Sequence, residues 1–292
     1  MELTTIFYYT DEFCKLFEKE FNMRFLSEGN GIRIRKISLT LSEIMTIAIY
    51  YHTSGYKTFK DYYNKSAELR PAFPGLPSYN RFIELQQKAC MPLAIFAKLQ
   101  SQGQCDGISF IDSFPLKVSH QKRIYSHKTF RGLATRGKTS VGWFYGFKVH
   151  IVINSKGEIL DFEITPGNVS DNNSSVIEKL TQKVHGEMYG DKGYLLNSNL
   201  FKKLYLKGVH MVTKLRSNMK NILMSIEDKL LLKKRGVIES VGAILKENLN
   251  IEHSRYRSPI TLAINVFTAL IGYSFRELKP SIYKKGFSSL SA

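Results

Sequence analysis

The segment 141–165 most constrains the fold of this chain, because it has the pattern of a hairpin of two long strands. Its first part is rich in β-branched and aromatic residues, a turn follows at 154–157, and the returning strand covers 158–165. The pattern predicts further short strands, at 107–112, 188–191 and 209–213. It predicts helices near 171–184, 198–207, 235–249 and 261–275. This alternation indicates a mixed α/β sheet with helices on its faces.

The first 104 residues show the apolar periodicity of helices instead, and predict an all-α domain. Thr40 and Ser78 each have the side chain that opens a helix. Residues 40–89 can form a helix-turn-helix with 78–88 as its reading helix and Asn80 and Arg81 facing bases; a simple packed bundle is the alternative. We predict three parts: a helical DNA-binding domain at 1–104, an α/β domain at 105–275, and a basic tail at 276–292.

The charge of the chain points to a polyanionic partner. It has 42 Lys and Arg against 25 Asp and Glu, a net charge of +17, and a pI near 9.6. Such a field favours nucleic acid first and an acidic membrane surface second. A membrane span is not predicted, because no run of about 18 apolar residues occurs. Three cysteines without a close pair, at 14, 90 and 105, suit a reducing cytoplasm.

The acidic residues are unevenly placed. After Asp112 none occurs until Glu158, and after Asp191 none occurs until Glu227. We expect each aspartate to end a short apolar strand, and ligands of an α/β sheet gather at the carboxyl ends of its strands. Two neighbouring carboxylates repel each other, which a hard cation such as Mg²⁺ relieves. The basic residues nearby are expected to contact DNA phosphates; they include Arg123, Lys128, Lys148 and Lys192.

A third carboxylate, Glu239, lies in the predicted helix 235–249. At about 100° per residue, Arg235 and Lys246 share its face, as do two small residues at 242 and 243. A carboxylate between two cations suits a metal-bound phosphate with its neighbours held by Arg and Lys. The residues alone leave other interpretations open. A strand-end aspartate is often a turn or cap residue, and Glu239 with Arg235 can form an ordinary surface ion pair.

Two further expectations concern residues near these acids. Trp143, Tyr145 and Phe147 fit the core of the sheet or hairpin better than a platform for stacking bases. Asp171 is expected to cap the helix that follows the hairpin, in preference to acting as a metal ligand.

Four stretches carry a resemblance to a known family: Ile111–Leu116, Gly142–His150, Gly190–Tyr194 and Arg235–Lys246. Over most of residues 105–275 the chain resembles the DDE transposases of bacterial insertion sequences, and it looks closest to the nine-eight-two family. The resemblance implies an RNase H-like fold. It also implies that Asp112, Asp191 and Glu239 are the catalytic residues and hold two Mg²⁺ ions, for which Mn²⁺ can substitute. In a related signature a tyrosine precedes the arginine by three residues; here that position is Leu232.

The function implied by this resemblance is DNA transposition. The protein would bind the terminal inverted repeats of its element as a homodimer, cleave the DNA strands, and join them to target DNA. It would work in the bacterial cytoplasm, associated with the nucleoid. Two alternatives stay open: an RNase H-like metal nuclease or resolvase without strand transfer, and a domesticated protein that binds DNA without cutting it.

Overall fold

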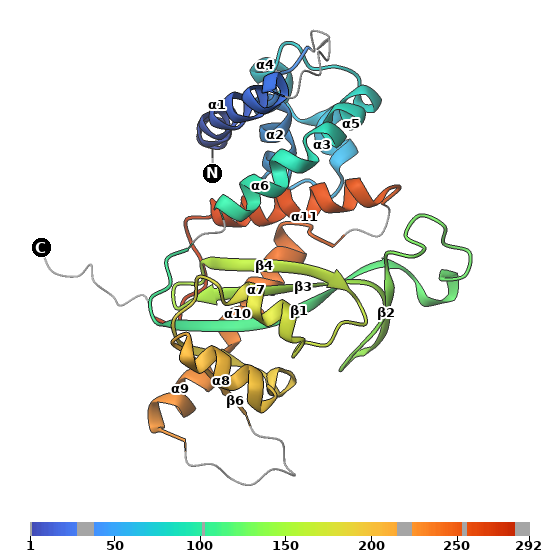
Figure 1. The fold of residues 1–292 in the computed structure, drawn as a ribbon. Helices are drawn as coiled ribbons and strands as arrows, with labels where there is room; N and C mark the ends of the chain where they lie inside the picture. The colour runs from blue at the N-terminus through green and yellow to red at the C-terminus, as the bar shows by residue number, and fades with distance from the viewer. Residues whose placement is uncertain (1, 28–37, 101–102, 215–223, 253–255, 284–292) are drawn as a thin grey trace, which may run out of the picture. The chain divides into compact units, whose positions relative to one another are not determined.

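The computed structural model describes residues 2–27, 38–100, 103–214, 224–252 and 256–283 (Figure 1). The chain divides into two compact units. The first comprises Met1–Gln100, Leu245–Ile251 and Tyr256–Glu277, and the second Ser101–Ile244, Glu252–Arg255 and Leu278–Ala292. The predicted functional division at 104 and 275 stays a prediction, and 284–292 of the predicted tail lie outside the described residues.

The first unit is built from helices, as the sequence predicts. Thr40 opens the second of them with a capping box: its Oγ1 accepts a hydrogen bond from the Glu43 amide at 3.2 Å, while the Glu43 carboxylate accepts from the Thr40 amide at 2.6 Å. A further helix begins directly after Ser78, which confirms that start. The α-helices are α1 (Leu3–Ser27), α2 (Leu41–Tyr50), α3 (Phe59–Lys65), α4 (Leu69–Ala72), α5 (Tyr79–Lys88), α6 (Cys90–Gln100) and α11 (Pro259–Ser274).

The core of this unit forms around α11, which packs against α2 and α6. His52, in the short 3₁₀-helix η1 (Tyr51–Thr53) after α2, is buried there. Its Nδ1 donates to the Leu249 carbonyl oxygen at 2.5 Å, and its Nε2 lies 2.8 Å from Oγ1 of Thr268. Burial lowers the pKa of His52 to about 4, so the imidazole is neutral at physiological pH. Within the described part of the chain, none of the helices combines the length and hydropathy that a bilayer span requires.

The second unit contains a mixed sheet, which confirms the predicted α/β fold. Among the described residues six strands form it, in the order β2-β3-β1-β5-β6, with β4 also paired to β3. β1 is antiparallel to β3 and parallel to β5, and β4 is antiparallel to β3. The strands are β1 (Ile108–Ser119), β2 (Thr135–Thr139), β3 (Gly142–Asn154), β4 (Ile159–Pro166), β5 (Gly186–Gly190) and β6 (Val209–Thr213).

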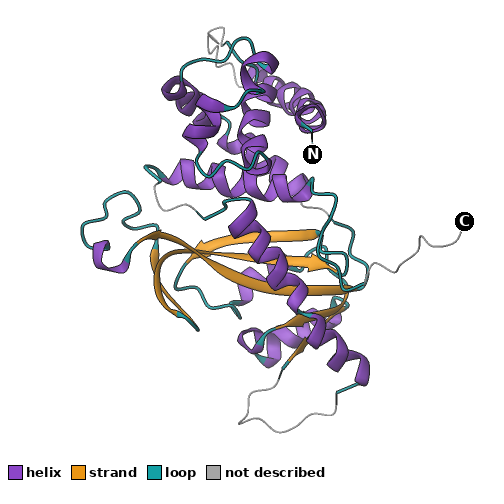
Figure 2. Cartoon of the chain, turned by 180° about the vertical axis from the view of Figure 1, so that it is seen from behind, coloured by secondary structure: helices purple, strands orange, loops and turns teal. Residues whose placement is uncertain are grey.

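Helices cover both faces of this sheet, as expected for an RNase H-like core. Figures 1 and 2 show α7 (Ser174–Leu180) and α10 (Gly236–Ala243) on opposite faces. Successive side chains of β1 point to opposite faces of the sheet, so neighbouring residues pack against different helices. Ile111 joins the apolar cluster formed with α7 and α8 (Ser198–Leu206), whereas Phe114 faces α10, where it lies next to Gly242.

Gly146 marks the point at which β3 changes partners. Before it, β3 pairs with the edge strand β2, and after it with β4. A Cβ at this position would collide with the backbone carbonyl of Leu116 on β1. The absence of a side chain therefore lets the two strands approach each other closely where the sheet narrows into the β2–β3 ribbon.

The predicted helix 235–249 is confirmed in its extent, but its last turn is not α-helical. The structure has α9 (Ile226–Lys234), then α10, and then a π-helical turn at Ile244–Asn248. The predicted alignment of Lys246 with Glu239 assumed an α-helical period throughout. Because each π-type hydrogen bond spans one residue more, that period does not continue through the turn to Lys246.

Candidate active site

Asp112 and Asp191 occupy equivalent positions on two parallel strands. The β1–β5 pairing runs through three residue pairs and ends at Phe110 with Tyr189. Asp112 lies two residues after Phe110, and Asp191 lies two residues after Tyr189, so the two aspartates stand at matching positions. The prediction that Asp112 closes its strand is wrong, since β1 continues to Ser119 by pairing with β3. The pairing of β1 with β5 nevertheless ends before Asp112. Both aspartates therefore stand at the end of that parallel pairing, at one edge of the sheet.

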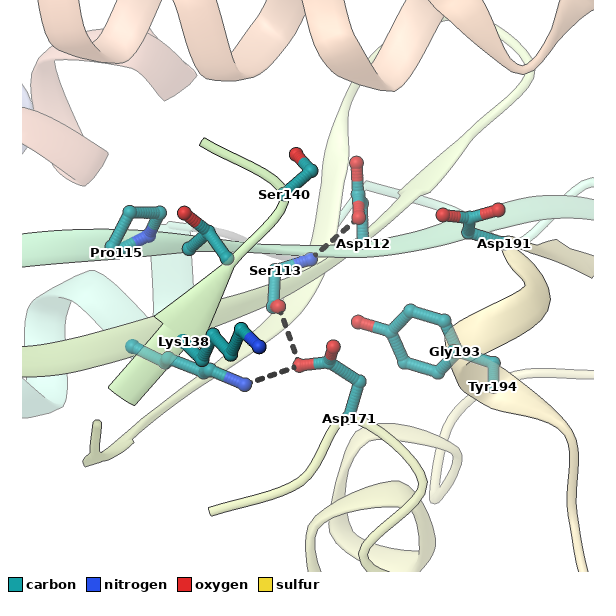
Figure 3. Close-up of a pocket in the computed structure, with 11 residues that line it drawn as sticks. Asp112, Ser113, Pro115, Lys138, Ser140, Asp171, Asp191, Gly193 and Tyr194 are labelled. Atoms are coloured by element: carbon teal, nitrogen blue, oxygen red, sulfur yellow. Dashed lines mark hydrogen bonds and ion pairs between the residues drawn. The ribbon is translucent and has the colours of Figure 1, made fainter. Parts of the chain in front are cut away.

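These two aspartates line one pocket of about 500 Å³, shown in Figure 3. In each, Oδ1 accepts a hydrogen bond from the next backbone amide: Ser113 donates to Asp112 at 2.9 Å, and Lys192 donates to Asp191 at 2.6 Å. Burial raises the pKa of Asp112 to about 6, against the opposing effects of the Ser113 amide and of Arg235. The pocket therefore holds an anionic carboxylate in surroundings that disfavour its charge.

Arg235 connects Asp112 to the third predicted carboxylate. It lies at the junction of α9 and α10. Its Nη1 is 3.4 Å from Oδ2 of Asp112, and its Nη2 is 2.6 Å from Oε1 of Glu239. The Arg235 side chain is only 16% exposed, against 59% for Glu239. The Arg235–Glu239 pair is therefore one arm of a fork that joins two carboxylates, rather than an isolated surface ion pair.

The oxygen-rich donor set of this pocket suits a hard divalent cation. Asp112 and Asp191 present carboxylates from neighbouring strands to one volume, and carboxylate oxygen is the ligand type that Mg²⁺ prefers. Among the described residues, no three His, Cys, Asp or Glu side chains already form a group that could hold a metal ion. Glu239 is instead engaged by Arg235, whose guanidinium donates to both it and Asp112.

A third acidic residue of the pocket, Asp171, was not predicted as part of the site. Its Oδ1 accepts hydrogen bonds from Ser113 Oγ at 2.7 Å and from the Lys148 ammonium at 3.0 Å. The predicted capping role is wrong, because α7 is capped by Asn173, whose side chain accepts from the Val176 amide. A signal for Asp171 was available: it follows β4, which runs parallel to β1, so its position is again beyond the carboxyl end of a strand.

Tyr194 closes the wall of the pocket beside these groups. Its ring is buried, and Figure 3 shows its hydroxyl on the side of Ser113 and Asp171. Burial raises the pKa of this phenol well above its ordinary value, so the hydroxyl keeps its proton. This wall therefore presents a hydrogen-bond donor beside Asp171.

The predicted DNA-contacting cations occupy different surroundings. Lys148 is buried, and its ammonium also donates to the Val169 carbonyl at 2.9 Å. Lys192 is exposed directly after Asp191. Arg123 and Lys128 are exposed between β1 and β2. In the first unit, Arg81 pairs with Glu84 of its own helix at 2.7 Å, and Lys246, of intermediate exposure, lies in the π-helical turn.

Trp143 corrects the expectation of a core residue. Tyr145 is buried as predicted and Phe147 is partly buried, but the Trp143 side chain is exposed, at 57%, beside a buried Phe144. Trp143 and Phe144 point to opposite faces of the β2–β3 ribbon, whereas Tyr145 lies on the face of Trp143 but reaches the buried Phe130, whose carbonyl accepts from its hydroxyl at 3.3 Å. The sequence could not separate these adjacent aromatics without knowing which face is covered.

Comparison with known proteins identifies the family of the chain. No curated protein matches the chain. A family model described as a transposase DDE domain matches residues 102–259, which is more than half of the sequence and includes every acidic residue of the site described above. The narrower assignment to the nine-eight-two family stays a prediction. The chain belongs to the DDE transposases.

Proposed function

We propose that this transposase cleaves DNA at the ends of its mobile element and joins those ends to target DNA, with Asp112, Asp191 and Glu239 as its catalytic carboxylates. The observation that carries the proposal is the placement of Asp112 and Asp191 at one sheet edge, in one pocket. The Arg235 fork supports the inclusion of Glu239, since it holds that carboxylate to Asp112 through a single cation.

These three residues would hold the divalent cations of the reaction, Mg²⁺ or its substitute Mn²⁺. When bound, such cations supply Lewis-acid activation of the attacking and leaving oxygens of a phosphodiester. Two backbone amides hold one oxygen of each aspartate in place, which fixes the direction of the carboxylates before substrate binds.

The cations beside the carboxylates would orient the scissile phosphate. Arg235 has a planar fork that matches two phosphate oxygens as well as it matches carboxylates. With Asp112 and Glu239 holding a divalent cation, the Arg235 guanidinium would be free to donate to a DNA phosphate. Lys192, exposed next to Asp191, can contact the neighbouring phosphate as a point charge.

Binding of the DNA outside the pocket would depend on the basic surface. Arg123 and Lys128 are exposed between β1 and β2, and with Lys246 they are proposed contacts to the backbone; Lys148 would contact DNA only from within the pocket wall. The helical unit would recognise the terminal repeats, with Arg81 among its contacts. Two ends must be held at once for joining, which a homodimer achieves. The protein would act in the bacterial cytoplasm at the nucleoid.

A strand-cleavage and joining assay tests this proposal. The full chain is incubated with labelled element ends, a target plasmid, and Mg²⁺ or Mn²⁺. We expect both cleaved ends and joined products, and neither after Asp112→Asn, Asp191→Asn or Glu239→Gln, although DNA binding is retained. Glu178→Gln, a surface acid on α7, is the matched control and keeps full activity.

Three outcomes would contradict the proposal. Cleavage without joining indicates the nuclease or resolvase alternative. DNA binding with neither product indicates the non-catalytic alternative. Retention of chemistry in any of the three carboxylate variants would show that the site residue is wrongly assigned.

A further inference from the structure

The β2–β3 ribbon presents a single exposed tryptophan between cations. Trp143 is the only tryptophan in the chain. Its cross-strand partner is Lys138, whose Nζ lies 5.7 Å from the centre of the indole ring. On the same strand as Lys138, Arg136 lies over the exposed ring of Tyr125 at 5.5 Å. A large aromatic side chain left 57% exposed contributes little to the core, and it keeps a flat surface available to a ligand.

A second pocket, of about 480 Å³, lies against this tryptophan. It is contiguous with the pocket of Asp112 and Asp191, because the two share Lys138, Lys148, Asp171 and Gly193. Its volume is in the range of small-molecule sites. Its polar lining is completed by Asn168, Ser170 and Asn172. A ligand seated there would adjoin the carboxylates of the proposed active site.

The charge of this second pocket favours a phosphate. Arg136 and Lys138 line it, and the Lys148 ammonium is already neutralised by Asp171, the only acidic residue of the lining. The sequence between Asp112 and Glu158, which includes β2 and β3, contains no acidic residue. Two cations beside an exposed indole ring therefore form a surface that matches both parts of a nucleotide.

We propose that this second pocket binds an unpaired nucleotide of the DNA substrate, with its base stacked on Trp143 and its phosphate held by Arg136 and Lys138. The inference rests on the proposed function in taking DNA as the ligand. An unpaired base is required because bases within a duplex have their faces covered by their neighbours. Such a nucleotide would fix the position of the adjoining strand relative to Asp112 and Asp191.

Fluorescence of the single tryptophan tests the proposal directly. The full chain carrying Asp191→Ala is titrated in EDTA with a blunt duplex, with the same duplex bearing an unpaired tail, and with that tail made abasic. We expect the tailed duplex to quench Trp143 strongly, and the blunt and abasic forms to quench it weakly. Equal quenching by blunt and tailed DNA, or no quenching although DNA binds, would overturn the proposal.

Affinity measured by anisotropy of labelled DNA provides the second readout. Trp143→Ala should weaken binding of the tailed duplex on the order of tenfold, the usual scale for one stacked base, and leave the blunt duplex unchanged. Tyr205→Ala, which removes another exposed aromatic of the same unit, is the matched control and changes neither. An equal loss for both DNAs after Trp143→Ala would instead indicate a duplex contact.

These measurements separate the inference from the proposed function. They need neither divalent cation nor catalysis, so the pocket can be established even if the carboxylate variants retain activity. Conversely, normal cleavage and joining together with unchanged Trp143 fluorescence would overturn this inference alone.

Discussion

The ammonium of Lys148 lies 3.0 Å from Oδ1 of Asp171, in the wall of the carboxylate pocket. Lys148 is carried into that wall by β3 and is only 8% exposed. A buried ammonium is strongly disfavoured unless an anion compensates for its lost hydration. Asp171 supplies that anion, so its first role is to allow a cation inside the pocket.

Asp171→Asn should therefore destabilise the protein. We expect a loss of roughly 2 kcal/mol, below the value for a fully buried pair because the Asp171 side chain is 31% exposed. Urea unfolding measures it. The double variant Lys148→Met with Asp171→Asn should cost less than the sum of the single changes. Glu178→Gln, which breaks the surface pair with Lys203, should cost less than about 0.5 kcal/mol; a similar cost for both single carboxylate changes would refute the argument.

Asp112→Asn should stabilise the metal-free protein at pH 8. The folded-state pKa of Asp112, raised by burial to about 6, exceeds its unfolded value. Folding favours the protonated form of Asp112. The stability gained in this way is fully present below about pH 4 and is lost as the pH rises through 6. Because the side chain is 29% exposed, we expect a gain of about 1 kcal/mol. Thermal unfolding of both proteins in EDTA, at pH 8 and at pH 4, measures this gain in stability. A gain of the same size at pH 4 would show that the buried charge of Asp112 is not its cause.

Protonation of His52 should destabilise the helical unit in acid. Its folded-state pKa of about 4 lies below the unfolded value near 6.5. The stability it contributes is present above pH 6.5 and is lost as pH falls toward 4, with a total on the order of 3 kcal/mol. His52→Gln should reduce the slope of stability against pH in this range, as measured by urea unfolding. His185→Gln, at an exposed position, should leave that slope unchanged, and equal slopes in all three proteins would exclude His52 as the cause.

Gly146→Ala should disrupt the junction of the β2–β3 ribbon with the sheet. The added Cβ would overlap the Leu116 carbonyl, and a forced shift of this kind costs roughly 2–3 kcal/mol. Gly236→Ala is the control, since no atom lies within 4 Å of its added Cβ and alanine favours a helix. Chemical unfolding of both variants checks the contrast; a Gly146→Ala protein as stable as wild type would show that the strands can separate at this point.

The sequence was sufficient to predict the layers of the second unit and two carboxylates of its pocket. The hairpin 141–165 and the apolar strands before Asp112 and Asp191 have strong period-two or continuous apolar patterns, which burial in the sheet requires. β2 was missed because Thr135–Thr139 is an edge strand of mainly polar residues, and such strands have little apolar pattern. α9 was missed for a similar reason, as only Leu232 among its residues is buried.

The contacts inside the pocket could not be derived from the sequence. Asp171 reaches Ser113 and Lys148 from a loop, and its neighbour Asn173 has an equally good capping side chain. The position of Arg235 between Asp112 and Glu239 depends on where α9 ends and α10 begins. Both features are tertiary: they follow from the packing of segments distant in the chain, which local patterns do not encode.

The helical unit is completed by α11, which is supplied by a distant part of the chain, and this limits how the unit can be transferred to another protein. This helix comes from residues 259–274, after all the strands, and the buried partner of His52 includes its Thr268. A fragment ending near residue 104 would lack α11 and would expose the apolar surfaces of α2 and α6 that pack against it. Grafting the amino-terminal segment alone onto another protein should give an insoluble product unless α11 is transplanted with it.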